Sequence, residues 1–277
     1  MWHGFCIVFM RVSRVKIREA SRKRTGARQR KEEGGVLMEN LTYIGLSQEI
    51  ALNRQMNMVA NNIANMSTPG YKSEGVLFKQ YITQAPQGGE KVSEVQESGT
   101  YRDLTEGPLT NTSNKLDAAI DGAGYFAVMT PQGIRYTRDG SFSLNGSREL
   151  VTKQGYPVMD VSDNPLTLQP GATGVNITSD GHISTSVGPV GQLKVATFTD
   201  PQALKAEGGD LYSAGNMIEQ PADSSKVLQG MLEGANVNPI SEMNNMIQIS
   251  RMYEAALHLM SNDHSEQMTM IQHLSQV

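Results

Sequence analysis

Helical periodicity at both ends of the chain, and its absence in between, most constrains the fold of this sequence. Between Leu41 and Met66 the apolar residues recur at steps of three, four or multiples of four, which is typical of one face of an amphipathic helix. Asn40 suits the N-cap position, and Thr68-Pro69-Gly70 ends the pattern because proline disfavours helical backbone in the preceding residue. We therefore predict a helix over residues 41–66.

A second helix is predicted after Asn238-Pro239. Its apolar stripe consists of Met243, Met246, Ile249, Tyr253, Ala256 and Met260. Further apolar residues widen this stripe and continue it to the C-terminus. A face this wide exceeds what a single partner helix covers, so we expect several neighbours to bury it.

The middle of the chain has short alternating runs rich in β-branched and aromatic residues. Runs at 125–129, 134–137, 141–144 and 193–198 predict strands, and glycine-containing turn signals separate them. The expected fold is mixed: an all-β middle domain over 99–228, flanked by N- and C-terminal α-helices that pack together as a coiled-coil-like assembly domain. The polar stretch 76–98 is interpreted as a linker between the segments 38–75 and 99–228, and the second helical segment covers 229–277.

Charge and cysteine content exclude several classes of protein. Residues 1–37 hold 10 of the 24 Lys/Arg and 3 of the 28 Asp/Glu, which leaves 14 basic and 25 acidic residues in 38–277. A surface this acidic is repelled by phosphate backbones, so we expect no nucleic-acid partner. Cys6 is the single cysteine, which excludes an intramolecular disulfide and a zinc site made of cysteines. No apolar run has membrane-spanning length.

The first 37 residues differ from the rest. A short apolar patch precedes the basic run Arg11–Lys31, which is the reverse of the order in a secretory signal. We interpret 1–37 as a non-native or disordered extension and Met38 as the start of the chain.

Signals for catalysis are weak. Gly122-Ala123-Gly124-Tyr125-Phe126-Ala127 fits a dinucleotide fingerprint, but a strand is predicted to follow it where that fingerprint requires a helix. His258, His264 and His273 lack the spacing of a helical metal site. We therefore predict no catalytic, cofactor-binding or metal-binding residues, no cofactor and no small-molecule substrate.

Two motifs carry a resemblance to a known family. The segment Ala60–Asn65 with Ser67–Lys72, and the tail Glu233–Asn238 with the residues from Glu242 to Ala255, resemble the paired terminal signatures of bacterial flagellar axial proteins. Asp121-Gly122 and Tyr136–Gly140 resemble the start of the middle domain in the rod and hook group. A chain of 240 residues from Met38 is too short for a hook protein and longer than the smallest rod subunits. Within the rod family it most resembles the proximal-rod type, which the stretch Gly230–Pro239 favours, and the distal-rod type is the alternative.

The resemblance implies a structural subunit of the periplasmic drive shaft. Its partners are then copies of itself, other rod subunits and the flagellar type III export apparatus. The implied assembly residues are Asn61, Asn62, Ile63, Asn65, Thr68, Gly70 and Tyr71 in the first motif, and Asn236, Val237, Met243, Met246, Ile249, Arg251, Tyr253 and Met260 in the second. A soluble periplasmic hydrolase or binding protein, whose helices pack only on its own β domain, is the alternative of a different class.

Overall fold

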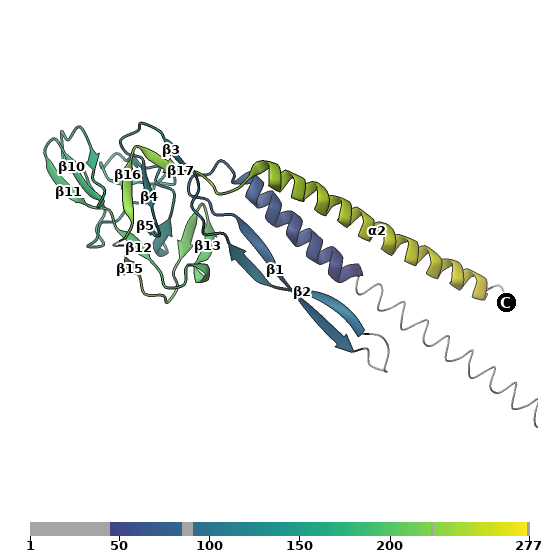
Figure 1. Cartoon of the computed structure of the whole chain (residues 1–277). Coiled ribbons are helices and arrows are strands. Elements are labelled where there is room, and N and C mark those ends of the chain that lie inside the picture. Colours follow the sequence, from purple (N-terminus) through teal and green to yellow (C-terminus); the bar gives the residue numbers. More distant parts are fainter. Residues whose placement is uncertain (1–44, 85–90, 223, 276–277) are drawn as a thin grey trace, which may run out of the picture. The chain divides into compact units, whose positions relative to one another are not determined.

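In the computed structural model, which describes residues 45–84, 91–222 and 224–275, one helix precedes and one helix follows a β-rich middle along the chain (Figure 1). Residues 45–64 are helical, and α2 spans Pro239–Ser275. The mixed fold and both helices are thus confirmed. The first helix ends before the predicted Met66 because the spacing of its backbone hydrogen bonds changes there. The Asn65 amide donates to the Asn61 carbonyl, four residues earlier, whereas the Thr68 amide donates to the Asn65 carbonyl, three residues earlier. Asn40 lies outside the described residues.

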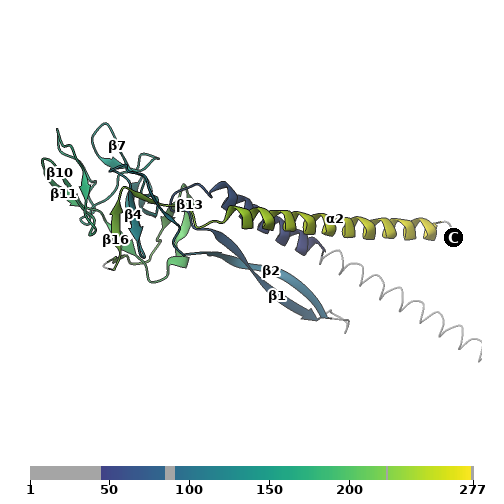
Figure 2. The same cartoon turned by 45° about the horizontal axis from the view of Figure 1, so that its top comes forward.

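The chain divides into two compact units. Within the described residues, the first unit contains 45–53, the parts of 78–97 outside 85–90, and 250–275, whereas the second contains 54–77 and 98–249. In each unit a part of the first helix lies beside a part of α2 (Figure 1 and Figure 2). These parts are 45–53 with the stretch after Ser250, and 54–64 with the start of α2.

The described residues between the helices contain strands β1 to β17. In chain order they are β1 (Glu74–Gln84), β2 (Lys91–Arg102), β3 (Leu109–Asn111), β4 (Ala118–Asp121), β5 (Tyr125–Thr130), β6 (Gly133–Thr137), β7 (Ser143–Leu144), β8 (Leu150–Val151), β9 (Asn176–Ile177), β10 (His182–Thr185), β11 (Gly188–Gln192), β12 (Val195–Thr197), β13 (Lys205–Gly208), β14 (Leu211–Ser213), β15 (Gln220–Pro221), β16 (Lys226–Gln229) and β17 (Met231–Glu233). A 3-10 turn at Pro201–Ala203 precedes β13.

A six-stranded sheet with the order β13-β14-β6-β5-β12-β15 forms the centre of the second unit. Strand β5 lies between two cores because alternate residues of a strand point to opposite faces. Phe126 and Val128 pack into one core with Phe142, and Tyr125 and Ala127 pack into the other. A strand buried on both faces needs a continuous apolar run, which explains the sequence YFAV at residues 125–128, whereas Met129 is exposed.

The end of the β-rich middle returns to its beginning. Strand β16 pairs antiparallel with β4, and β17 pairs antiparallel with β3. Gly230, with φ of 73°, allows the sharp change of direction between β16 and β17. These two pairings place β16 and β17, which precede α2, next to β3 and β4, which follow β2.

The strands differ from prediction at three places. Strands β5 and β6 confirm the runs at 125–129 and 134–137, whereas β7 and β12 are shorter than the runs at 141–144 and 193–198. The stretch 76–98, interpreted as a linker, instead contains most of β1 and β2, which pair with each other (Figure 1). Its polar composition concealed a β-hairpin, although β1 carries the aromatic and β-branched residues that favour strands.

Candidate functional site

An asparagine ties the end of the first helix to the start of β1. The Asn62 side chain is 2% exposed, and its Oδ1 accepts hydrogen bonds from Tyr71 Oη at 3.1 Å and from the Glu74 amide at 3.0 Å. Its Nδ2 donates to the Glu74 carbonyl at 2.9 Å. Because a carboxamide offers both an acceptor and donors, it can satisfy the backbone of Glu74 in both directions. Asn62 therefore fixes the turn that follows the helix.

Gly70 makes a close backbone approach in that turn. Its φ is 74°, and its amide donates to the Glu233 carbonyl at 2.8 Å. A Cβ atom at this position would lie 2.5 Å from the carbonyl carbon of Arg138. The turn thus requires glycine both for its backbone conformation and for the space beside Arg138.

A buried ion network lies directly beside this turn. Lys72 Nζ contacts Glu233 Oε1 at 2.6 Å, and Arg138 Nε contacts Glu233 Oε2 at 3.0 Å, with all three side chains at most 4% exposed. The Gly107 amide also donates to Glu233 Oε1. Burial lowers the pKa of Lys72, and its hydrogen bond to Glu233 opposes that shift. Glu233 therefore holds together parts of the chain that are far apart in sequence.

Asn236 completes the connection from the other side. Its Oδ1 accepts from the Ser73 amide at 2.7 Å, and its Nδ2 donates to the carbonyls of Asp103 and Thr105. The Asn236 amide donates to the Tyr71 carbonyl. We call the set Asn62, Gly70, Lys72, Arg138, Glu233 and Asn236 the motif junction. The structure thus brings together the two terminal motifs that the sequence analysis selected.

The other predicted residues of these two motifs have smaller roles in the junction. Asn65 donates to the Asn61 carbonyl and accepts from Thr68 Oγ1, so these three shape the helix end. Ile63 and Val237 are partly buried. Whether any of these side chains also contacts another subunit stays a prediction.

Sequence reasoning missed the ion network. Lys72, Arg138 and Glu233 all stand inside the quoted motifs, but none was predicted to form an ion pair. The signal was a charged residue within each of three separate motifs. That signal alone does not indicate that the three residues meet.

Four of the six predicted residues on α2 are buried or half-buried. Ile249 is buried, and Met246, Tyr253 and Met260 are half-buried. In the first unit, Tyr253 Oη donates to Glu49 at 3.1 Å. Met243 and Arg251 are exposed. This part of the predicted stripe therefore has a partner within the chain, and its role between subunits stays a prediction.

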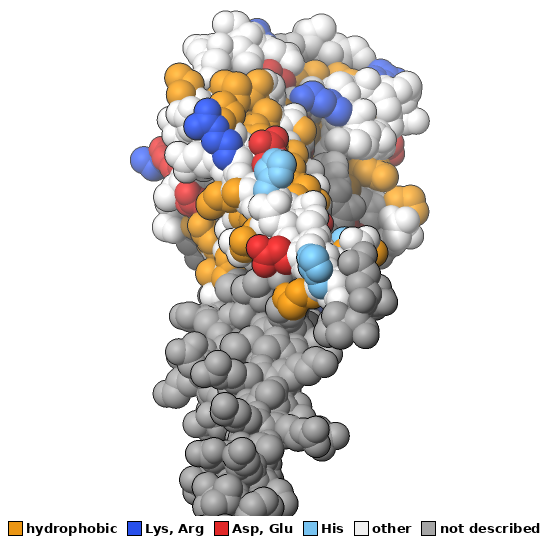
Figure 3. Space-filling view, turned by 90° about the vertical axis from the view of Figure 1, so that its right-hand side faces the viewer, with side chains coloured by type: hydrophobic (Ala, Val, Ile, Leu, Met, Phe, Trp, Pro, Cys, Tyr) orange, Lys and Arg blue, Asp and Glu red, His pale blue; other side chains and the backbone are white. Residues whose placement is uncertain are grey.

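A second apolar stripe on α2 is exposed. At the start of the helix it consists of Ile240, Met243 and Ile247, which are spaced by three and four residues. Further along α2, Met252, Leu257, Leu259, Met268, Met270 and Ile271 are also exposed. Hydrophobic side chains reach the surface in the view from the side on which α2 ends (Figure 3). An exposed apolar stripe at helical spacing indicates a contact surface for another helix.

The described residues offer little for chemistry. They contain no group of three or more His, Cys, Asp or Glu side chains arranged to hold a metal ion. No helix among them is both long and apolar enough to cross a membrane. Gly122 and Gly124, in the glycine-rich motif, have positive φ and precede strand β5 rather than a helix.

Comparisons with known proteins agree with this arrangement. Models of a flagella basal body rod protein, of the flagellar hook protein FlgE/F/G D1 domain and of the flagellar basal body rod FlgEFG protein C-terminal match residues 43–72, 119–185 and 228–272. The flagellar basal-body rod protein FlgF of Caulobacter vibrioides is 36% identical over 229 residues, which cover 81% of this chain and 94% of the relative. The chain belongs to the flagellar basal-body rod family.

Other relatives in this rod family carry two names. FlgF of Mesorhizobium japonicum is 33% identical, over 80% of this chain and 92% of the relative. FlgG of Buchnera aphidicola from Schizaphis graminum is also 33% identical, over 80% of this chain and 93% of the relative. Each of the three matched regions contributes to the motif junction: Lys72 comes from the first, Arg138 from the second and Glu233 from the third.

Proposed function

We propose that this rod-family chain is a structural subunit of the proximal rod, which helps to transmit torque across the periplasm. It acts by assembling with copies of itself and with other rod subunits, not by catalysis. The proximal type is supported by the FlgF name of the Caulobacter and Mesorhizobium relatives. Export by the flagellar type III apparatus belongs to the same proposal.

The exposed stripe on α2 carries this proposal. Met243 and Ile247 are each 50% exposed, and Ile240 is 70% exposed. Large apolar side chains lose contact with water when a neighbouring helix covers them, and full burial of one is worth about 1.5–3 kcal/mol. A second subunit that packs along this stripe supplies that burial.

A different side of α2 supports a coiled-coil-like layer. The less exposed positions Glu242, Met246, Ile249, Tyr253, Ala256 and Met260 alternate in steps of four and three. This heptad spacing is typical of helices that pack at a small crossing angle. In such a subunit, one side of α2 packs within the chain and the exposed stripe is free to pack on another subunit. Repeated subunits can then build a continuous layer of helices.

A double substitution tests the outer stripe. Met243→Asp with Ile247→Asp places two charges on it, and we expect loss of rod assembly and swimming while the free chain keeps its unfolding midpoint. The matched control is Asn244→Asp with Gln248→Asp, which adds the same charges at exposed polar positions with the same spacing. Normal swimming with the first pair refutes the proposed surface. Ile249 is unsuitable for this test because it is buried within the chain.

The distal-rod type is the second candidate because FlgG relatives reach similar identity and coverage. Expression of this chain in Caulobacter strains that lack FlgF or FlgG separates the two. We expect restored swimming in the strain without FlgF. Restoration only in the strain without FlgG would establish the distal type.

A further inference from the structure

Methionine side chains reach the surface of α2. The exposed methionines on this helix are Met243, Met252, Met268 and Met270. Met159, in contrast, is 0% exposed in a core of the second unit. Oxidation of a thioether requires that its sulfur meets a dissolved oxidant, so the rate follows the exposure of the side chain. The α2 methionines are therefore open to a peroxide in solution, and Met159 is not.

Met243 has a special place among them because it belongs to the exposed stripe at the start of α2. It lies between Ile240 and Ile247, at spacings of three and four residues, and it is 50% exposed. An uncharged, flexible thioether fits an apolar surface of this kind. A chemical change at this sulfur therefore changes the surface through which we propose that subunits pack.

We propose that Met243 is a site of oxidation by peroxides, and that its sulfoxide keeps the free subunit out of the rod. A sulfur lone pair attacks one oxygen of hydrogen peroxide, so that an S–O bond forms and the O–O bond breaks. The leaving hydroxide takes the proton from the transferred oxygen and becomes water. The sulfur loses two electrons and the peroxide gains them. The effect on assembly, though not the oxidation itself, rests on the proposed function.

A sulfoxide is unfavourable in the contact that the stripe makes. Its oxygen accepts hydrogen bonds, whereas the side chains of Ile240 and Ile247 have no donor to offer. Because a buried acceptor without a donor costs free energy, a subunit that covers the oxidised stripe binds more weakly. A neighbouring subunit that covers Met243 also shields it from peroxide, so oxidation acts before assembly.

The first experiment measures oxidation on the free, full-length chain. The purified chain is treated with hydrogen peroxide, and the sulfoxide at each methionine is followed by peptide mass spectrometry. We expect Met243 to be oxidised at least tenfold faster than Met159. A smaller difference overturns the modification site, whether or not the chain builds rods.

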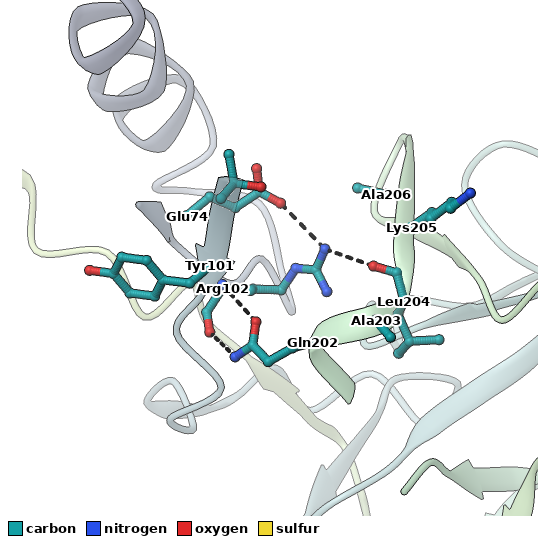
Figure 4. A pocket seen from close by; sticks show the side chains of 9 residues that line it. Glu74, Tyr101, Arg102, Gln202, Ala203, Leu204, Lys205 and Ala206 are labelled. Atoms are coloured by element: carbon teal, nitrogen blue, oxygen red, sulfur yellow. Dashed lines mark hydrogen bonds and ion pairs between the residues drawn. The ribbon is translucent and has the colours of Figure 1, made fainter. Parts of the chain in front are cut away.

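The buried Arg102 guanidinium shows in the same sample whether the second unit is still folded. It lies beside a cavity of about 490 Å³, and its Nη2 donates to the Leu204 carbonyl at 3.3 Å and to Glu74 at 3.4 Å (Figure 4). None of the described residues that line this cavity is a methionine. We therefore expect an unchanged Arg102 Nε–H signal by NMR when Met243 is oxidised. Loss of this signal refutes the proposal, because oxidation then acts through the fold.

The second experiment tests the effect on assembly in the Caulobacter strain that lacks FlgF. Met243→Gln makes the stripe polar, whereas Met243→Leu keeps it apolar and removes the sulfur. Met129→Gln is the matched control, because Met129 is exposed on β5, outside the stripe. We expect Met243→Gln to reduce incorporation into basal bodies at least tenfold, while the other two variants are incorporated like the wild type. Normal incorporation of Met243→Gln contradicts the effect on assembly.

Peroxide treatment of the same cells completes the test. We expect the wild type to lose incorporation and Met243→Leu to keep it, since leucine cannot form a sulfoxide. Equal losses in the two would show that Met243 is not the site that controls assembly. Absence of the untreated wild-type chain from basal bodies would instead refute the proposed function, and the oxidation rates would still decide the modification site.

Discussion

Glu233→Ala is the sharpest test of the motif junction. The substitution removes the carboxylate that contacts Lys72 at 2.6 Å and Arg138 at 3.0 Å, and it also leaves the Gly107 amide without that acceptor. Because the two cations remain buried, loss of one partner from such a pair costs about 3–5 kcal/mol. With a urea dependence of about 2 kcal/mol per molar, the midpoint should fall by roughly 1.5–2.5 M.

The assay is urea unfolding of the full chain, followed by circular dichroism. The control is Glu207→Ala, which breaks the pair of Arg135 with a carboxylate that is 42% exposed. An exposed pair is worth about 0–1 kcal/mol, so this control should shift the midpoint by no more than roughly 0.5 M. Equal midpoints for Glu233→Ala and the control would show that the network does not stabilise the junction.

Two further predictions concern single positions in the second unit. In urea unfolding, Gly70→Ala should destabilise the chain more than Gly230→Ala. The two glycines have similar φ angles of 74° and 73°, but only at Gly70 would an added Cβ lie within 4 Å of another residue, Arg138. Equal losses of stability would mean that backbone strain alone causes the effect. Burial, together with the nearby charge of Asp139, raises the pKa of Asp210 from 3.8 to about 6. Between pH 3.8 and about 6 the folded chain therefore binds more protons than the unfolded chain, so the stability of the fold falls as the pH rises through this range. Asp210→Asn should remove that fall and raise the unfolding midpoint at pH 7 but not below pH 4, and an unchanged pH profile would contradict the shift.

The sequence was informative where a pattern is local. The period of the residues from Met246 to Met260 predicted a helix and its inner face, and glycine-bounded alternation predicted β5 and β6. The hairpin of β1 and β2 was missed because partner strands, not the polarity of the 76–98 stretch, decide its structure.

The ion network could not be read from the sequence for a different reason. Lys72, Arg138 and Glu233 are residue types that are rarely buried, and only the pairing of β3 with β17 and the turn at Gly70 brings them together. Their burial is a property of the tertiary structure, so a single sequence with no positional covariation does not contain it in readable form.

The contact of Lys72 with Glu233 can form only late in the production of the chain. It joins residues 161 positions apart, and closing a flexible loop of that length costs about 4–5 kcal/mol of chain entropy. Because a chain is synthesised from its N-terminus, Lys72 is in place long before its carboxylate partner is made. A chain that stops before residue 233 therefore cannot close the junction.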